Sequence, residues 1–284
     1  EVYRQMAPTL EVMGRFRAPR AAQVWEVPVH TPDVLAAADA VDAFLEAYWI
    51  SGQQRWLDAA VEWARRGLPF IYLWEDSEKP FLLGASIPVF GATWHRGSWF
   101  GRPVQWNGLR YAAALLKLAP HDQTLPWRKL AALIVHSAVH QQAPDGPDVA
   151  LWPDNISAID SQRCPWVFAP RQIISCIGEL MDRPEEPRTV IVGQGDRRLH
   201  LTATGRIGQP VWDRNGLQFT ITYPAGEQGV VLVSPMGRPE EVRLDGQPVP
   251  ERRQLEESEE PGWRYDAGYA YLCIRIVRSG PVQV

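Results

Sequence analysis

The sequence predicts an α+β protein with more than one domain, in which helical hairpins are followed by an antiparallel β-sandwich. Apolar residues recur every three or four positions between residues 31 and 183, whereas residues 188–284 contain short β-rich runs separated by turn residues. The 13 tryptophans are also unevenly distributed, because eleven of them lie between Trp25 and Trp166. We therefore predict a short β-rich segment at residues 1–30, a helical domain at 31–183 and a sandwich at 188–284.

Two helices are predicted to form a first hairpin. Residues 10–17 and 23–30 read as short strands, and Thr31-Pro32-Asp33 then has the pattern of a helix start, with Thr31 as the N-cap. The helix that begins there ends near Gly52, and a second helix covers residues 54–66. So short a turn between two helices predicts an antiparallel pair.

The hairpin pattern occurs again further along the chain. Residues 106–118 and 127–142 are predicted to be helical, with the turn between them, and a fifth helix is expected at 171–181, after Pro170. From residue 188 onward the pattern changes to strands. These are expected at residues 188–192, 198–204, 217–223, 229–233, 241–244, 262–265 and 269–277.

Composition excludes several classes of protein and partner. The net charge is −4, from 29 basic and 33 acidic residues, without a long run of one sign, so we expect no nucleic-acid partner. The three cysteines show no C-x-x-C spacing, which argues against a disulfide framework and a cysteine zinc site. No apolar run reaches the roughly 18–20 residues of a membrane span, so a membrane partner is not expected.

The two connections between hairpins, at residues 68–105 and 143–170, are much longer than the turns inside them. Hairpins of this kind bury their apolar faces by stacking, as an open solenoid or as a closed α/α toroid. In a regular stack, both connections lie at the same end. Long loops in a compact domain are usually functional, which makes these two segments the place to look for a site.

The connections combine tryptophans with carboxylates, amides, arginine and histidine, the set of side chains that is typical of a sugar site. An indole stacks on the apolar face of a pyranose, polar side chains bind its hydroxyls, and paired carboxylates supply acid and base. The candidate catalytic residues are Glu75, Asp76, His95, Asp154 and Asp160. The candidate substrate-binding residues are Trp94, Arg96, Trp99, Trp106, Trp152 and Asn155.

A structural explanation exists for each group. Trp49, Trp56, Trp63 and Trp127 occupy helix positions and are expected to pack between helices, and the loop acids could cap helices or turns. His136 and His140 have the i,i+4 spacing of a metal-binding pair. They lack the glutamate of the zinc-protease motif and a third ligand nearby, so a surface or buried pair is favoured. We expect no metal and no cofactor.

The stretch AYWISGQQRWLDAA at residues 47–60 resembles the pattern A-Y-x-x-T-G-D-x-x-Y-L-x-x-A of the six-hairpin (α/α) toroid glycosidases and polysaccharide lyases. The stretches PVQWNGL at 103–109 and YAAALL at 111–116 are similar in kind. A toroid followed by a sandwich is also the domain order of several such enzymes. The resemblance covers residues 25–284 and implies a partial α/α toroid that acts on an oligo- or polysaccharide.

The residues and the resemblance together indicate a glycoside hydrolase. One loop carboxylate would protonate the glycosidic oxygen, while a second would activate water or attack the sugar. A polysaccharide lyase is the enzyme alternative, in which His95 with Tyr72 or Tyr111 would remove a proton and Arg96 or Arg102 would neutralise a uronate. The third alternative is a carbohydrate-binding or scaffold protein without catalysis.

Five predicted helices are fewer than a ring of six hairpins requires. On the resemblance, the chain would be the C-terminal part of a longer enzyme, whose N-terminal half would then be a partner, or its hairpins would form an incomplete arc.

Overall fold

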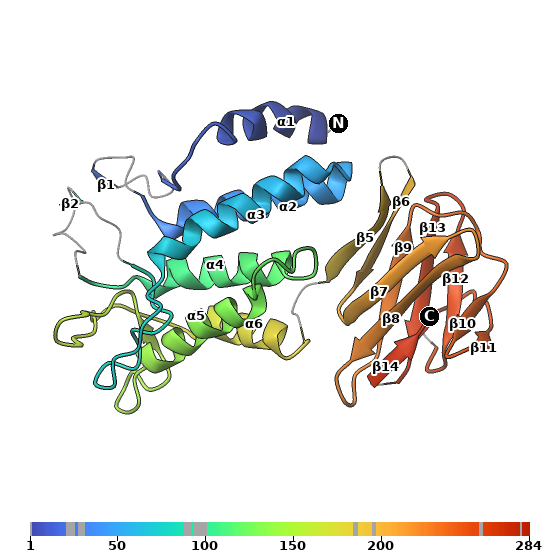
Figure 1. Cartoon of the computed structure of the whole chain (residues 1–284). Coiled ribbons are helices and arrows are strands. Elements are labelled where there is room, and N and C mark those ends of the chain that lie inside the picture. Colours follow the sequence, from blue (N-terminus) through green and yellow to red (C-terminus); the bar gives the residue numbers. More distant parts are fainter. Residues whose placement is uncertain are drawn as a thin grey trace. The chain divides into compact units, whose positions relative to one another are not determined.

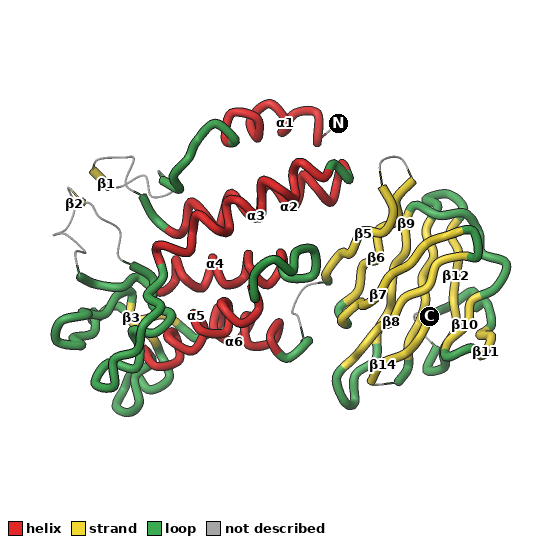
Figure 2. Tube along the Cα trace, in the orientation of Figure 1, coloured by secondary structure: helices red, strands yellow, loops and turns green. Residues whose placement is uncertain are grey.

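The computed structural model describes residues 2–20, 26–27, 32–87, 92–93, 101–183, 187–194, 197–255, 258–278 and 280–284 (Figure 1). By compactness the chain forms two units, which we describe separately. The helical unit consists of Glu1–Tyr48 and Gln54–Leu180, and the β unit consists of Trp49–Gln53 and Met181–Val284. Figure 2 shows that nearly all regular structure of the first is helical and that the second is built of strands.

The helical unit contains two helical hairpins and a further helix, as the apolar spacing predicts. Its helices are α1 (Val2–Met13), α2 (Val34–Ser51), α3 (Gln54–Gly67), α4 (Gln105–Leu118), α5 (Trp127–Gln141) and α6 (Arg171–Leu180), with a 3-10 turn, η1 (Leu68–Phe70). Two short strand pairs lie in the connections: β1 (Glu26–Val27) with β2 (Ala92–Thr93), and β3 (Trp152–Pro153) with β4 (Val167–Phe168). The five predicted helices are confirmed as α2 to α6, with ends that differ by at most three residues.

The predicted α/α toroid is wrong. The described part of the chain contains six α-helices, which are too few for such a ring, and the protein is instead α+β with antiparallel sheets. The resemblance to the toroid enzymes is therefore not supported by the structure. A short turn between two amphipathic helices specifies only that this pair is antiparallel. It does not specify how many further pairs follow, which is what distinguishes a ring from a small bundle.

The N-terminal segment is also different from the prediction, because residues 2–13 form helix α1 where a strand was expected from residue 10 onward. Its half-buried and buried side chains are Tyr3, Met6, Ala7, Leu10 and Met13, a spacing of three and four residues that matches a helix. The indole nitrogen of Trp56 in α3 donates a hydrogen bond of 2.9 Å to the hydroxyl of Tyr3. Three of these five residues precede Leu10, so the helical period is not visible in residues 10–17 alone.

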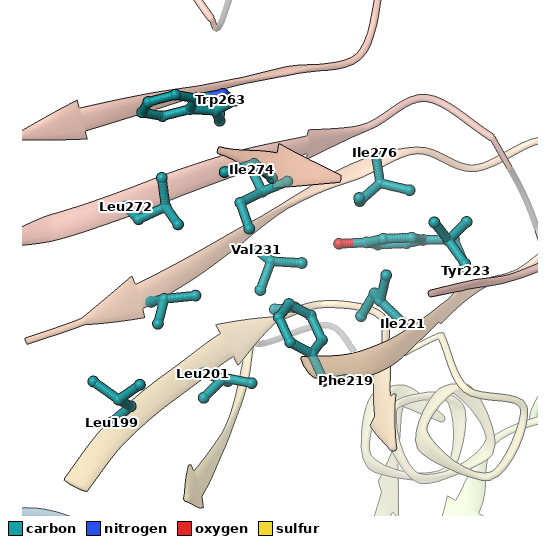
Figure 3. Packing of buried hydrophobic residues seen from close by; sticks show 14 residues of the cluster. Leu199, Leu201, Phe219, Ile221, Tyr223, Val231, Trp263, Leu272, Ile274 and Ile276 are labelled. Atoms are coloured by element: carbon teal, nitrogen blue, oxygen red, sulfur yellow. The ribbon is translucent and has the colours of Figure 1, made fainter. Parts of the chain in front are cut away.

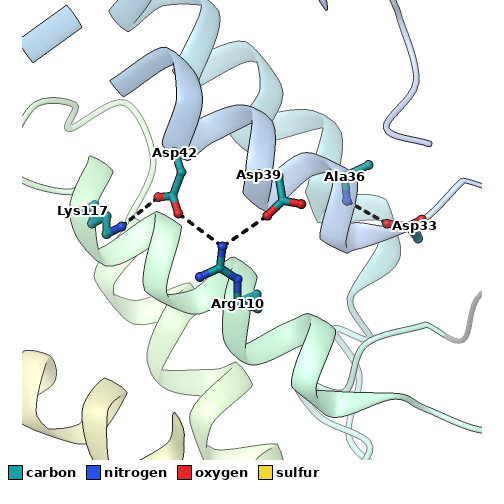
Figure 4. A network of polar contacts seen from close by, with 6 residues as sticks. All are labelled: Asp33, Ala36, Asp39, Asp42, Arg110 and Lys117. Carbon is teal, nitrogen blue, oxygen red and sulfur yellow. Dashed lines mark hydrogen bonds and ion pairs between the residues drawn. The ribbon is translucent and has the colours of Figure 1, made fainter. Parts of the chain in front are cut away.

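Aromatic and ionic contacts join α2, α3 and α4. Phe44 of α2 stacks on Trp56 of α3 with ring centroids 5.8 Å apart. Figure 4 shows Arg110 of α4 between two carboxylates of α2, at 3.2 Å from Asp39 and 3.7 Å from Asp42. The packing interpretation of the helix tryptophans is confirmed for Trp56, Trp63 and Trp127, which are all buried.

The start of α2 is capped by Asp33, whose carboxylate accepts a hydrogen bond of 2.7 Å from the backbone N–H of Ala36 (Figure 4). The sequence analysis assigned this cap to Thr31, which lies outside the described residues. Either residue type can cap a helix, and the chain uses the one directly before Val34.

A buried glutamine, Gln105, connects three segments at the start of α4. Its side-chain oxygen accepts a hydrogen bond of 2.9 Å from the N–H of Ser86, and its amide nitrogen donates to the carbonyls of Gly84 and Ile134 at 3.0 and 2.9 Å. The loop comes so close to α5 that a Cβ on Gly84, whose φ is +84°, would lie 2.0 Å from the carbonyl oxygen of Leu133. Only glycine fits there.

The β unit contains two antiparallel sheets that enclose one core. The five-stranded sheet has the order β12-β13-β9-β6-β5, the three-stranded sheet has the order β14-β8-β7, and β10 pairs with β11. The strands are β5 (Arg188–Gln194), β6 (Arg197–Ala203), β7 (Arg206–Asp213), β8 (Gly216–Tyr223), β9 (Gly229–Ser234), β10 (Val242–Leu244), β11 (Gln247–Val249), β12 (Gly262–Asp266), β13 (Tyr271–Ile276) and β14 (Gly280–Gln283).

Alternating residues of both sheets build the core of the β unit, as Figure 3 shows. Leu199 and Leu201 of β6 and Ile274 of β13 belong to the larger sheet, while Phe219 and Ile221 of β8 belong to the smaller one, and all five are buried. This alternation has the period of two that a half-buried strand requires. The pattern was therefore readable in the sequence, and the strands predicted there correspond to β5, β6, β8, β9, β10, β12 and β13.

Sequence reasoning missed β7, β11 and β14 in the β unit and the short strands β2, β3 and β4 in the connections. In β7 the pairing with β8 shifts between Gly208 and Val211, and Pro210 lies within the shift. Glycine and proline weaken the strand signal at such irregularities.

Within the described residues, no helix has both the length and the apolar character that crossing a membrane requires.

Replacing Gln105 by leucine tests the connection at the start of α4. The exchange keeps the size of the side chain but leaves the N–H of Ser86 and two carbonyls without their partner in a buried place. We expect the free energy of unfolding to fall by about 2–4 kcal/mol, measured by urea denaturation. Gln123→Leu is the matched control, because the exposed Gln123 also donates to a backbone carbonyl, that of Ala119. A similar loss in both variants would contradict the special role of Gln105.

His121 predicts a dependence of stability on pH. Burial lowers the pKa of this histidine from 6.5 to about 4, so the folded chain keeps it neutral while the unfolded chain binds a proton below pH 6.5. The free energy of unfolding is therefore unaffected by His121 above pH 6.5. It falls as the pH decreases from 6.5 towards 4, by about 3 kcal/mol in total. His121→Gln should flatten this part of the stability profile in urea denaturation. Parallel profiles of the two proteins would show that His121 does not titrate in this way.

Candidate functional site

The two long connections contact each other beside the start of α4. The N–H of Ile156 donates to the carbonyl of Pro103 at 3.2 Å, and the N–H of Ala158 donates to the carbonyl of Gly101 at 2.8 Å. Apolar side chains of both connections also pack together, since Ile156 belongs to a small buried cluster with Phe81 and Leu82. The expectation that the connections lie at the same end is confirmed for these segments.

The second connection forms a short two-stranded ribbon. Trp152 pairs with Phe168 and Pro153 pairs with Val167. The N–H of Asp154 donates to the carbonyl of Trp166 at 2.8 Å, which continues the same pairing by one step. Residues directly opposite each other in such a pair have their side chains on the same face. Asp154 and Trp166 therefore lie side by side on one face of the ribbon.

Arg102, Asn155 and Asp154 form a chain of hydrogen bonds between the connections. The Nε of Arg102 donates to Oδ1 of Asn155 at 2.5 Å, and the amide nitrogen of Asn155 donates to Oδ2 of Asp154 at 3.0 Å. Arg102 also donates to the carbonyl of Gln162 at 2.9 Å. Asn155 is buried and Asp154 is half-buried. This trio brings together two predicted site residues, Asp154 and Asn155.

Asp160 has a structural role in a turn of the same connection. Its carboxylate accepts a hydrogen bond of 3.1 Å from the N–H of Gln162, and its own N–H donates to the hydroxyl of Ser157 at 3.3 Å. The hydrogen bonds from Ser157 and Gln162, together with the charge of Arg102, lower the pKa of the Asp160 carboxyl. Because it remains ionised and is exposed, Asp160 is poorly suited to be a general acid.

Among the described residues, the acids of the first connection form no hydrogen bond with the trio. Glu75 is exposed, and Asp76 accepts a hydrogen bond of 2.9 Å from the N–H of Glu78 across a turn. Within the described residues, no hydrogen bond joins either acid to Asp154 or Asp160. The structure thus supports the turn-capping interpretation for Asp76, and the predicted pairing of loop carboxylates stays a prediction.

Trp152 cannot be the sugar platform that the sequence suggested, because only 1% of it is exposed. Its ring packs against Phe168 with centroids 5.4 Å apart, and its indole nitrogen donates to the carbonyl of Ala169 at 3.1 Å. Trp106 is half-buried in the first turn of α4. A tryptophan in a loop has the same sequence signal whether it is exposed or forms the loop's own core.

Four predicted residues, Trp94, His95, Arg96 and Trp99, lie outside the described residues. Among the residues of the lyase alternative, Tyr111 is buried, and its hydroxyl donates to the carbonyl of Ala64. Burial also raises the pKa of Tyr111. A polysaccharide in solvent cannot reach this hydroxyl, so Tyr111 is excluded as the base of a lyase.

Sequence reasoning missed Trp166, which is 46% exposed. It follows Cys164 and Pro165 in the second connection, and its tryptophan neighbour in the ribbon, Trp152, was chosen instead. The signal that could have identified it is pairing: once 152–153 and 167–168 are read as a ribbon, Trp166 is opposite Asp154.

The comparisons with protein families, with curated proteins and with solved structures found no match to this chain. The described residues also contain no group of three or more histidine, cysteine, aspartate or glutamate side chains that could hold a metal ion. The candidate site is therefore described from the hydrogen bonds and exposure of its own residues.

Arg102→Lys tests whether the trio holds the two connections together. Lysine retains the charge but lacks the fork that reaches both Asn155 and the carbonyl of Gln162. We expect the amides of Ile156 and Ala158 to exchange with solvent about tenfold faster, equivalent to a loss of about 1.4 kcal/mol. Hydrogen exchange followed by mass spectrometry measures this. Arg55→Lys changes an exposed ion pair with Glu11 and should leave the exchange at 156–158 unaltered.

Proposed function

We propose that this protein binds carbohydrate on the face of the ribbon that carries Trp166 and Asp154. The observation that carries the proposal is the exposed indole of Trp166 opposite the carboxylate of Asp154, which accepts a hydrogen bond from Asn155, itself bonded to Arg102. We call these four residues the Trp166 surface. It combines a flat apolar ring with a fixed acceptor for hydroxyl groups, the two elements that recognition of a pyranose needs.

Each residue of the Trp166 surface has a distinct part in the proposed binding. The indole of Trp166 stacks on the apolar face of a sugar ring. The carboxylate of Asp154 receives one hydrogen bond from Asn155 at Oδ2 and has further acceptor positions for sugar hydroxyls. Asn155 and Arg102 are positioning residues, since Asn155 is buried and Arg102 is bonded to it. Their hydrogen bonds reduce the entropy that Asp154 would otherwise lose on binding.

Binding is better supported than hydrolysis. A glycosidase needs two carboxyl groups about 5–10 Å apart on opposite sides of the glycosidic bond. Asp154 is one suitable carboxylate, but Asp160 and Asp76 accept hydrogen bonds within turns and Glu75 is exposed. Hydrolysis thus remains an alternative that an activity assay must test, and a lyase has lost one of its two candidate tyrosines.

Trp166→Ala is the direct test of the proposal. A glycan array probed with the full chain identifies the bound sugar, and calorimetric titration then measures the dissociation constant. Loss of the stacking ring should raise this constant about tenfold or more, a change of 1.4 kcal/mol or above. Asp154→Asn should also weaken binding, because an acceptor oxygen is replaced by a donor. Tyr269→Ala, which removes an aromatic side chain that is 80% exposed in the β unit, is the matched control.

Two results would contradict the proposal: no glycan bound by the wild-type chain, or equal affinity in Trp166→Ala and wild type. The same preparations incubated with the bound glycan test the hydrolase alternative. If reducing ends are released by the wild-type chain and not by Asp154→Asn, the Trp166 surface is an active site and the protein is a hydrolase.

A further inference from the structure

Two histidines on α5 form a close pair outside the Trp166 surface. The Nε2 atoms of His136 and His140 are 3.0 Å apart, which is hydrogen-bond distance, and the ring centroids are 4.3 Å apart with the planes tilted by 60°. A metal ion bound by both Nε2 atoms would replace this hydrogen bond, with the proton of each ring on Nδ1. Both residues are exposed. The pair therefore presents two imidazole nitrogens to solvent at the same point of the helix surface.

The opposite face of α5 is fixed, which holds the pair in register. Ser137 and Gln141 are buried and bonded to each other at 3.2 Å, and the hydroxyl of Ser137 donates to the carbonyl of Phe81. Arg163 donates to the carbonyls of Gln141 and Gln142 at the end of the helix, each at 3.2 Å. Because these contacts anchor the turn that carries His140, little backbone freedom has to be lost when both imidazoles bind one ligand.

The distance between the nitrogens fits a metal ion. Histidine nitrogens bind zinc and similar ions at about 2.0–2.1 Å, so two of them at angles between square-planar and tetrahedral lie about 2.9–3.4 Å apart. The observed 3.0 Å falls in this range. Residues four apart on a helix lie on the same face, which is how other helical sites present two histidines to one ion.

We propose that His136 and His140 bind one divalent transition-metal ion through their Nε2 atoms. Imidazole ligands select copper, nickel or zinc and disfavour magnesium and calcium, which prefer oxygen. In the proposed site these two imidazoles are the protein ligands, and water would fill the remaining coordination positions. Such an open site binds its ion reversibly and leaves positions free for an additional ligand. The Trp166 surface plays no part in this inference.

Titration calorimetry of the full chain at neutral pH with nickel, copper, zinc and magnesium chlorides tests the site. We expect affinity to rise from nickel to copper, with zinc weaker than copper and no binding of magnesium. Loss of a hydrogen-bond partner of a ligand usually weakens a metal site by 10–100-fold, so His136→Gln and His140→Gln should each raise the dissociation constant at least about tenfold. His200→Gln removes an imidazole from the β unit and should leave the constant unchanged.

A double variant, His136→Gln with His140→Gln, decides the matter. If it binds copper as tightly as the wild type, the ion is held elsewhere and the proposal is wrong. If each single variant binds as weakly as the double variant, both imidazoles act together on one ion, as proposed. Far-ultraviolet circular dichroism of each variant shows that the helices are retained, so that weaker binding is not caused by unfolding.

Discussion

The site depends on one buried amide, that of Gln105. Its three hydrogen bonds join the first connection at Ser86 and Gly84 to the second helical hairpin at α4 and at Ile134. All these groups are removed from water, where a missing partner costs more than a hydrogen bond contributes. Arg102 precedes Gln105 by only three residues, and so the amide that fixes the start of α4 also places the guanidinium that reaches Asn155.

Local pattern was sufficient for most of the helices and for the longer strands. Helices α2 to α6 follow from three- and four-residue spacing, and β6, β8, β9 and β13 follow from alternation, because both signals depend on neighbours within one element. The toroid and the N-terminal strand failed for different reasons. A toroid requires a certain number of helices, and local pattern does not give that number. The helical period of α1 depends on Tyr3 and Met6, which lie before the segment that was predicted to be a strand from Leu10 onward.

Composition indicated the connections as the candidate site, but it could not rank the residues within them. Asp154 as a catalytic residue and Asn155 as a substrate-binding residue stay predictions, and the hydrogen bond from Arg102 to Asn155 joins positions 53 residues apart. Asp160 has the same side chain as Asp154, but its carboxylate accepts a hydrogen bond from the backbone N–H of Gln162 within a turn. These differences arise from hydrogen-bond geometry, which has no counterpart in residue type or spacing.

Trp152 and Trp166 lie in the same connection but differ in exposure, since one is buried and the other is 46% exposed. Both lie on the same face of one ribbon, and both adjoin aromatic or acidic partners across the pair. A 28-residue connection needs an apolar centre if its backbone is to be ordered, and Trp152 with Phe168 supplies it. Trp166, by contrast, is 46% exposed and lies opposite Asp154 in the ribbon. An exposed indole opposite a carboxylate that is itself held by a hydrogen bond is the feature on which the proposed carbohydrate binding rests.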